Sequence, residues 1–175
     1  MLSTLAAPPP ETFTAPSGAV EVVRQVLSLP DDQLDYAEAK IAFDCAIDPS
    51  IDADAVLSEL DSMEAKAREL AGTASNEGDK LNALRKLIYD SGPWNGHRPF
   101  SYDKEDPFGT DSCNSRLGSY LQTRRGNCVS MPILFLILGE RLGLDLSLAC
   151  APSHFLVRYR SKSGQILNLE TTSGA

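Results

Sequence analysis

Apolar residues recur three or four positions apart along most of the first 143 residues, which is the spacing of an amphipathic helix. The clearest stretch is 56–70, and Gly72 follows it as a stop signal. Pro30 ends the first, shorter stretch because proline cannot continue a helix. The spacing predicts helices over 22–27, 34–47, 56–70, 79–90, 114–123 and 128–142.

The period changes from helical to alternating after residue 143. Apolar and polar residues alternate over 144–149, 154–159 and 165–170, and Ser163-Gly164 marks a turn before the last of these stretches. Alternation of this kind predicts three antiparallel strands. A helical N-terminal half followed by a small antiparallel sheet is an α+β fold.

Neither period holds between residues 91 and 112, where glycine, proline and aromatic residues gather. A long loop inside a compact domain is usually functional or disordered, and the aromatic content favours an ordered loop. We therefore expect this loop to form part of a cleft wall, with Trp94 and Tyr102 as lining residues.

The distribution of prolines and of the two periodic regions suggests one domain preceded by a tail. Residues 1–17 hold four prolines among Ser, Thr and Ala, which predicts a flexible tail. Residues 18–175 are expected to form a single domain, with a helical part over 18–143 and a sheet part over 144–175. Because the last predicted strand would leave a bare sheet edge, we expect that the natural chain continues past Ala175 or that the edge pairs with a second copy.

Composition supports one core and excludes several partners. The chain has 175 residues, 42% of them hydrophobic, and its 24 acidic against 16 basic side chains give a net charge of −8. That charge argues against nucleic acid or an anionic membrane surface as partner. The longest apolar run, 131–138, is far shorter than the roughly 20 residues of a membrane-spanning helix.

The cysteines are the first candidates for chemistry. They are widely spaced and form no CxxC pair, so neither a metal site nor a cofactor is expected. A chain of this length does not need disulfides, which favours reduced thiols and a cytoplasmic location. The four cysteines are Cys45, Cys113, Cys128 and Cys150.

Cys128 lies where a thiol is easily activated. Gly126 permits a tight turn before it, and Asn127 or Ser130 can cap the helix that follows. Free N–H groups and the positive end of the helix dipole favour a thiolate in such a first turn. The alternative is a small buried side chain, because cysteine is among the most buried residue types.

A histidine and an acid follow on predicted strands. His154 begins one strand and Glu170 ends the next, so a hairpin would bring the two side chains together. A carboxylate there could orient the imidazole as the third member of a catalytic triad. A half-buried structural histidine and an exposed edge-strand acid are the alternatives. Cys128, His154 and Glu170 are the predicted catalytic residues.

The remaining histidine, glutamine and cysteine candidates are less strongly indicated as catalytic residues. Gln122 lies six residues before Cys128 and is a candidate oxyanion donor, although the backbone N–H of Cys128 is the alternative. His97 has no matching carboxylate and is expected in a surface or loop role. Cys45 and Cys150 fall in apolar stretches and are expected in the core. Cys113 stands in a polar context and could react without being catalytic.

These residues and their surroundings resemble the transglutaminase-like superfamily, and within it a bacterial branch that often carries tetratricopeptide repeats after the core. The similar pattern comprises Asn114-Ser115-x-Leu117, Leu121, Arg124-Arg125-Gly126, an apolar helix, Arg141-Leu142-Gly143-Leu144, Pro152-x-His154-Phe155 and Val157-Arg158. The resemblance implies a papain-like core with a Cys-His-Asp/Glu triad. Many members of that branch lack the cysteine, whereas this chain keeps Cys128 and offers Glu170 in place of the commoner Asp.

Two functions follow from the residues and the resemblance. The first is a cysteine-dependent acyl-transfer or amide-hydrolysing enzyme that acts on a protein or peptide carboxamide. The second is a catalytically silent scaffold that binds a protein partner.

Overall fold

The computed structural model describes residues 17–30, 33–73 and 76–173. The predicted tail over 1–17 therefore lies outside the described residues, except for Ser17, which begins the first helix. The helices are α1 (Ser17–Leu27), α2 (Tyr36–Ile47), α3 (Ala53–Ala71), α4 (Glu77–Tyr89), α5 (Leu117–Thr123) and α6 (Ser130–Arg141).

The strands form a three-stranded sheet and a short ladder. The sheet has the order β3-β4-β5 and is antiparallel throughout, which confirms the α+β fold. The strands are β1 (Ser101–Tyr102), β2 (Arg125–Gly126), β3 (Asp145–Ala151), β4 (His154–Arg160) and β5 (Ile166–Leu169), and short 3-10 helices lie at η2 (Pro93–Asn95), η3 (Ser112–Ser115) and η4 (Thr171–Ser173).

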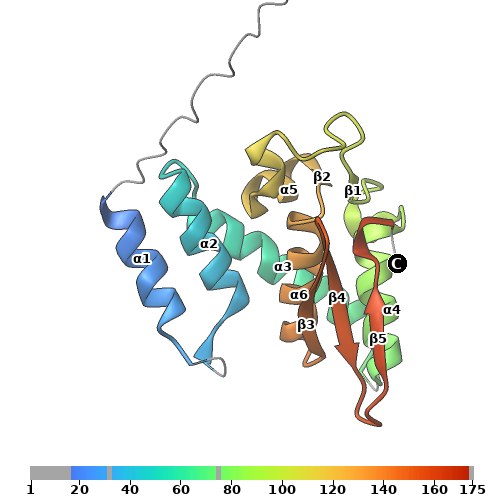
Figure 1. Cartoon of the computed structure of the whole chain (residues 1–175). Helices are drawn as coiled ribbons and strands as arrows, with labels where there is room; N and C mark the ends of the chain where they lie inside the picture. The colour runs from blue at the N-terminus through green and yellow to red at the C-terminus, as the bar shows by residue number, and fades with distance from the viewer. Residues whose placement is uncertain (1–16, 31–32, 74–75, 174–175) are drawn as a thin grey trace, which may run out of the picture.

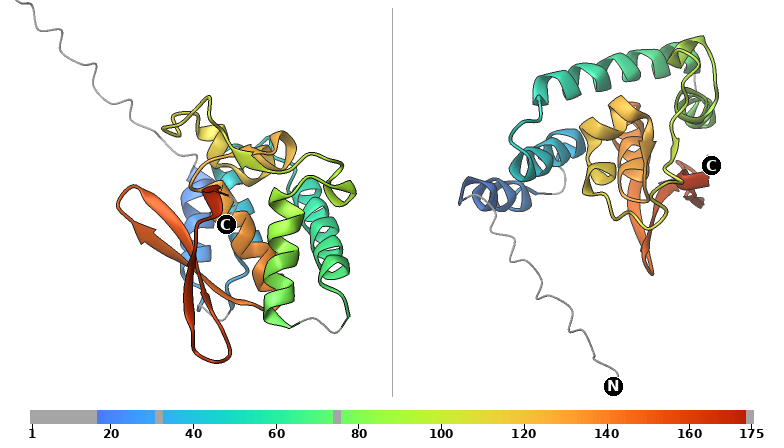
Figure 2. Two further views of the ribbon diagram at one scale, coloured as in Figure 1. Left: turned by 90° about the vertical axis from the view of Figure 1, so that its right-hand side faces the viewer. Right: turned by 90° about the horizontal axis from the view of Figure 1, so that it is seen from above.

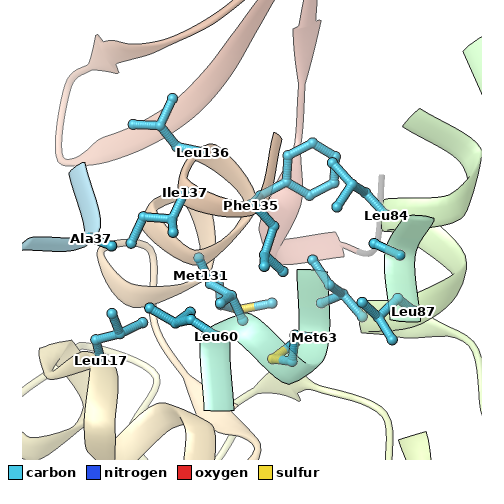
Figure 3. Close-up of a cluster of buried hydrophobic side chains, with 14 of the residues drawn as sticks. Ala37, Leu60, Met63, Leu84, Leu87, Leu117, Met131, Phe135, Leu136 and Ile137 are labelled. Carbon is cyan, nitrogen blue, oxygen red and sulfur yellow. The ribbon is translucent and has the colours of Figure 1, made fainter. Parts of the chain in front are cut away.

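Helix α6 lies at the centre of the molecule. The sheet packs against it through β3 and β4, while α2, α3, α4 and α5 contact its other sides (Figure 1). Its apolar side chains meet those of the surrounding helices in a single buried cluster, as Figure 3 shows. The labelled members of this cluster are Ala37, Leu60, Met63, Leu84, Leu87, Leu117, Met131, Phe135, Leu136 and Ile137.

Capping groups begin α3 and α4 slightly before the predicted starts at 56 and 79, whereas the stop predicted at Gly72 is confirmed. The Asp52 side chain accepts a hydrogen bond from the N–H of Ala55 at 3.0 Å and begins α3. Gly72 ends the same helix with a φ of +81°, a left-handed value that glycine adopts without strain. At α4, Asn76 and Asp79 form a reciprocal capping box.

The helix predicted over 114–123 is divided in two. Arg116 is extended between η3 and α5, with φ −88° and ψ 134°. The break is stabilised from outside the segment, because the buried carboxylate of Asp44 on α2 accepts a hydrogen bond from the N–H of Leu117 at 2.8 Å. A partner 73 positions away cannot be seen in the local pattern.

Helix α1 lies at the outer end of the helical part, beside α2 (Figure 2). Its apolar residues Val22, Val23 and Val26 are only half-buried, and Leu27 is 74% exposed. A hollow of about 350 Å³ separates this end of α1 from α6 and β3. None of the α1 side chains that the structure describes is fully buried, so this helix is loosely packed.

Candidate active site

The turn that carries Cys128 is fixed by hydrogen bonds on both sides. Its predecessor Asn127 accepts hydrogen bonds at Oδ1 from the N–H groups of Val129 and Ser130, at 2.9 and 3.2 Å. The expected capping role of Asn127 is thus present, and α6 begins at Ser130 rather than at Cys128 as predicted. Cys128 lies half-buried in the turn just before the helix, where the positive end of the helix dipole favours an anion.

Ser130 ties this turn to the preceding segment. Its hydroxyl is fully buried, accepts from the N–H of Asn127 at 3.1 Å and donates to the carbonyl of Asn114 at 2.7 Å. Asn127 also donates through Nδ2 to the Ser115 hydroxyl at 2.9 Å. The turn and η3 therefore behave as one hydrogen-bonded unit beneath Cys128.

Glycine is required on the entry side of the turn. A Cβ on Gly126 would lie 2.4 Å from the Ser130 hydroxyl and 2.6 Å from the Tyr120 ring. Gly126 also belongs to β2, which pairs in parallel with β1 so that Tyr102 stands opposite Gly126. The close packing and the pairing together bring Tyr102 beside the cysteine turn.

His154 and Glu170 meet as the hairpin prediction requires. Ring atom Nε2 of His154, at the start of β4, lies 2.8 Å from Oε2 of Glu170, which directly follows β5. The other oxygen, Oε1, accepts hydrogen bonds from the N–H and the hydroxyl of Thr172 at 3.0 and 2.5 Å. Both carboxylate oxygens of Glu170 are thus engaged, and the imidazole is held in one orientation.

These contacts determine the ionisation of Glu170. Partial burial raises the pKa of the carboxyl, but hydrogen bonds from Thr172 and His154 outweigh the burial and hold that pKa below its ordinary value. Glu170 is therefore an anion at neutral pH. Because it occupies Nε2, only Nδ1 of His154 is left to exchange a proton with a thiol.

Cys128 and His154 open into the same hollow, which has a volume of about 570 Å³. No hydrogen bond joins the Cys128 thiol to another group in the described part of the chain, His154 included. Burial raises the pKa of the Tyr102 phenol, and the nearby Cys128 adds to the increase. The lining residues are Tyr102, Lys104, Pro107, Phe108, Gly109, Cys128, Ser153, His154 and Thr172.

Two predicted site residues lie elsewhere. Gln122 is exposed on α5 and lines a different hollow, against Val56 and Glu59 of α3. The chain turns at Arg124, which has a φ of +61°, and then enters β2, so spacing along the sequence does not bring Gln122 to the thiol. Gln122 therefore does not line the Cys128 hollow, and its oxyanion role stays a prediction that this placement does not support.

Trp94 does not line the Cys128 hollow either, whereas Tyr102 lines it as predicted. The indole Nε1 donates to the carbonyls of Lys86 and Asp90 at 3.0 and 3.3 Å, at the end of α4. The Lys86 ammonium lies 4.3 Å from the ring centroid. Trp94 caps a helix and packs on it, which explains why an aromatic loop residue is not a cleft residue.

The remaining thiols and the second histidine take surface or packing positions. His97 is exposed in a turn with a φ of +59°. Cys45 is half-buried against the core, and Cys113 is exposed. Cys150 is exposed too, so its predicted core position is wrong; β3 is an edge strand and Cys150 lies near its end.

Among residues 17–30, 33–73 and 76–173, no three or more His, Cys, Asp or Glu side chains are grouped so that they could hold a metal ion. Within the same ranges no helix has the length and apolar character to cross a membrane.

Several residues of the site escape sequence reasoning. Thr172 and the lining residues 107–109 lie in stretches without a periodic pattern, and β1 and β2 are too short to produce one. One local signal was available, because a threonine two positions after an acid often returns a hydrogen bond to it. The pairing of β1 with β2 depends on tertiary contacts alone.

The sequence is similar to known proteins over most of the chain. A sequence model described as the transglutaminase-like superfamily matches residues 54–173, which include Cys128, His154 and Glu170. A curated relative named UPF0162 protein, from Vibrio cholerae, is 30% identical over 126 residues. The match covers 72% of this chain and 44% of the relative, so this chain spans less than half of that protein.

No solved structure matches the chain. The predicted relation to a branch with tetratricopeptide repeats stays a prediction, because neither match carries information on such repeats.

Proposed function

The chain belongs to the transglutaminase-like superfamily, and on that premise we propose that it is a cysteine-dependent enzyme that transfers or hydrolyses the acyl group of a protein or peptide carboxamide. One observation carries the proposal. Cys128 and His154 line a single hollow, and Glu170 contacts the His154 imidazole at 2.8 Å.

The first chemical step uses the free ring nitrogen. Nδ1 of His154 takes the proton of the Cys128 thiol, and the sulfur attacks the carboxamide carbon. The imidazolium that forms is stabilised by the anionic Glu170 at Nε2. The N–H of Cys128 forms no hydrogen bond within the described residues and is available to the developing oxyanion.

The second step releases the products. The tetrahedral intermediate collapses, the carbon–nitrogen bond breaks, and His154 returns its proton to the departing amine or ammonia. Water or a second amine then attacks the thioester, losing a proton to His154 as the carbon–sulfur bond breaks. The proton passes back to the thiolate, so Cys128 and His154 return to their starting state.

Alkylation by iodoacetamide tests the activation of the thiol. The proposal predicts that Cys128 at pH 6 is carbamidomethylated at least about tenfold faster than an unperturbed thiol, whose pKa near 8.5 leaves little thiolate. The exposed Cys113 and Cys150 provide reference thiols in the same sample. Peptide mapping by mass spectrometry gives the three rates separately.

The matched variants are Cys128→Ala and Glu170→Gln. The first should lose all activity on carboxamide substrates while leaving labelling of Cys113 and Cys150 unchanged. The second removes the charge that stabilises the imidazolium, so labelling of Cys128 at pH 6 should slow towards the reference rate. Equal rates for all three cysteines in the unmodified protein would overturn the proposal.

A second candidate function is a silent scaffold that binds a protein partner. It is favoured by the absence of a hydrogen bond between Cys128 and His154, both of which the structure describes. The same experiment separates the two candidates. A scaffold predicts an ordinary rate at Cys128 and no change in partner binding when Cys128→Ala is introduced.

A further inference from the structure

Phe108 is the most exposed large apolar side chain in the described part of the chain, at 90% exposure. It does not stand at random on the surface, because Pro107, Phe108 and Gly109 form one wall of the Cys128 hollow. A Cβ on Gly109 would lie 3.3 Å from Nδ2 of Asn127, the residue next to Cys128. Phe108 therefore lies on the wall of the same hollow that Cys128 lines.

The loop that presents Phe108 is held by a polar clamp. The Asp106 carboxylate accepts hydrogen bonds from the N–H and hydroxyl of Thr110, from the N–H of Asp111 and from Nδ2 of Asn114, all between 2.7 and 3.0 Å. The Tyr102 hydroxyl donates to the carbonyl of Pro107 at 3.0 Å. A loop fixed in this way loses little conformational entropy when it binds a ligand.

The charges around the loop leave its inner wall apolar or cationic. Asp103 accepts from Asn114 and lies 4.0 Å from Arg125, and Asp106 is engaged in the clamp. Lys104 lines the hollow and has no ion-pair partner within 4.0 Å among the described residues. A cationic side chain would find no free carboxylate on this wall, whereas an apolar side chain would cover Phe108 and Pro107.

We infer that Phe108 is a specificity residue, and that the preferred substrate carries a large apolar side chain next to the reacting carbonyl. The inference rests on the proposed function, since it assigns a substrate class to the same hollow. An exposed phenylalanine contributes little to folding, but covering its ring with a second apolar surface removes both from water. Serine and lysine at that substrate position gain nothing from the contact.

The test uses a series of chloroacetyl-capped amino acid amides, in which the reactive chloromethyl carbon is joined through one amide bond to an amino acid with a variable side chain. Cys128 displaces chloride from these probes, and the labelling rates at Cys113 and Cys150 correct for intrinsic reactivity. The corrected rate at Cys128 should be about tenfold higher with phenylalanine or leucine amide than with serine or lysine amide.

Three variants sharpen the test. Phe108→Ser should reduce the preference to about one, and Phe108→Leu should retain most of it. Ile166→Ser removes another exposed apolar side chain, 54% exposed on β5, and should leave the preference unchanged. Equal unfolding midpoints in urea would show that each variant is folded.

The outcomes distinguish this inference from the proposed function. If Cys128 reacts rapidly with every probe without preference, the specificity role of Phe108 is wrong and the activated thiol stands. If Cys128 reacts no faster than the reference thiols but still prefers phenylalanine amide through Phe108, the activated thiol is wrong and the apolar subsite stands. A preference that persists in Phe108→Ser overturns the inference.

Discussion

At the scale of single residues, the site depends on polar atoms that already have hydrogen-bond partners within the protein. The two carboxylate oxygens of Glu170 contact His154 and Thr172. The buried Ser130 hydroxyl accepts a hydrogen bond from one backbone N–H and donates one to a backbone carbonyl. A buried polar group that loses its partner costs free energy, because no water replaces the lost hydrogen bond. Residues that never touch a substrate are thus expected to control where the thiol stands.

Ser130→Ala tests this expectation directly. The substitution leaves the N–H of Asn127 and the carbonyl of Asn114 without their partner, so the free energy of unfolding should fall by about 1–3 kcal/mol. Urea unfolding followed by circular dichroism measures the change. Ser62→Ala is the matched control, because the exposed Ser62 hydroxyl bonds only to a carbonyl of its own helix, and it should shift stability by less than about 0.5 kcal/mol. A midpoint for Ser130→Ala equal to that of the unmodified protein would contradict the prediction.

At the scale of elements, some parts of the site are encoded locally and others are not. The alternation over 154–159 and 165–170 places His154 and Glu170 on neighbouring strands, and the antiparallel register of β4 and β5 brings them into contact. Helix α3 could also be predicted, since its period and Gly72 lie within the segment itself. The break before α5 depends on Asp44, far away in the chain, and could not be predicted.

Where the chain changes direction, sequence spacing is a poor guide to the site. Gln122 is close to Cys128 in sequence, yet the left-handed Arg124 and the β2 strand lie between them, and the two residues line different hollows. Trp94 does not line the hollow for a related reason, because its indole N–H donates hydrogen bonds to backbone carbonyls at the end of α4. Residue types indicated which chemistry to propose for the site, whereas loop geometry decided which of the candidates line the Cys128 hollow.

The loop over 103–111, which is held by hydrogen bonds to the Asp106 carboxylate, should lose stability only in a defined range of acid pH. Hydrogen bonds from Thr110 and Asp111 lower the pKa of Asp106 from an ordinary 3.8 to about 2. Because the folded-state pKa is the lower one, the contribution of this carboxylate is fully present above its ordinary pKa and is lost as the pH falls through about 2. The loop should therefore remain ordered at pH 3.

Asp106→Asn should open the loop at neutral pH, because the amide lacks the charge and one of the two acceptor oxygens. We expect several-fold faster hydrogen exchange at the N–H groups of Thr110 and Asp111, measured by mass spectrometry. Glu105→Gln is the control on the same loop, since Glu105 is exposed and its only ion pair is with Arg125 within the described residues. Exchange in Asp106→Asn that matches the control would show that the clamp does not hold the loop.

At the scale of the whole molecule, packing is uneven. One cluster surrounds α6, and the family match over 54–173 covers most of its members. Helix α1 contacts chiefly α2, and the apolar side chains of its last residue, Leu27, and of Leu29 just after it are exposed. Few buried contacts mean a low free energy of local unfolding.

We therefore expect the N–H groups of α1 to exchange with solvent at least about tenfold faster than those of α3, which lies against the central cluster. Hydrogen exchange by mass spectrometry on the full chain compares the two helices in one sample. A chain that begins at residue 33 should retain the urea midpoint of the full chain. Equal protection of α1 and α3 would be inconsistent with a loosely attached first helix.

The central position of α6 has a consequence for synthesis on the ribosome. The chain is made from the N-terminus, so α2 to α5 are available to cover one side of α6 as soon as α6 has emerged. The opposite side stays uncovered until β3 and β4 have followed. Between those two moments the nascent chain exposes a strongly apolar helix surface, and this interval is when a chaperone would have its main opportunity to bind.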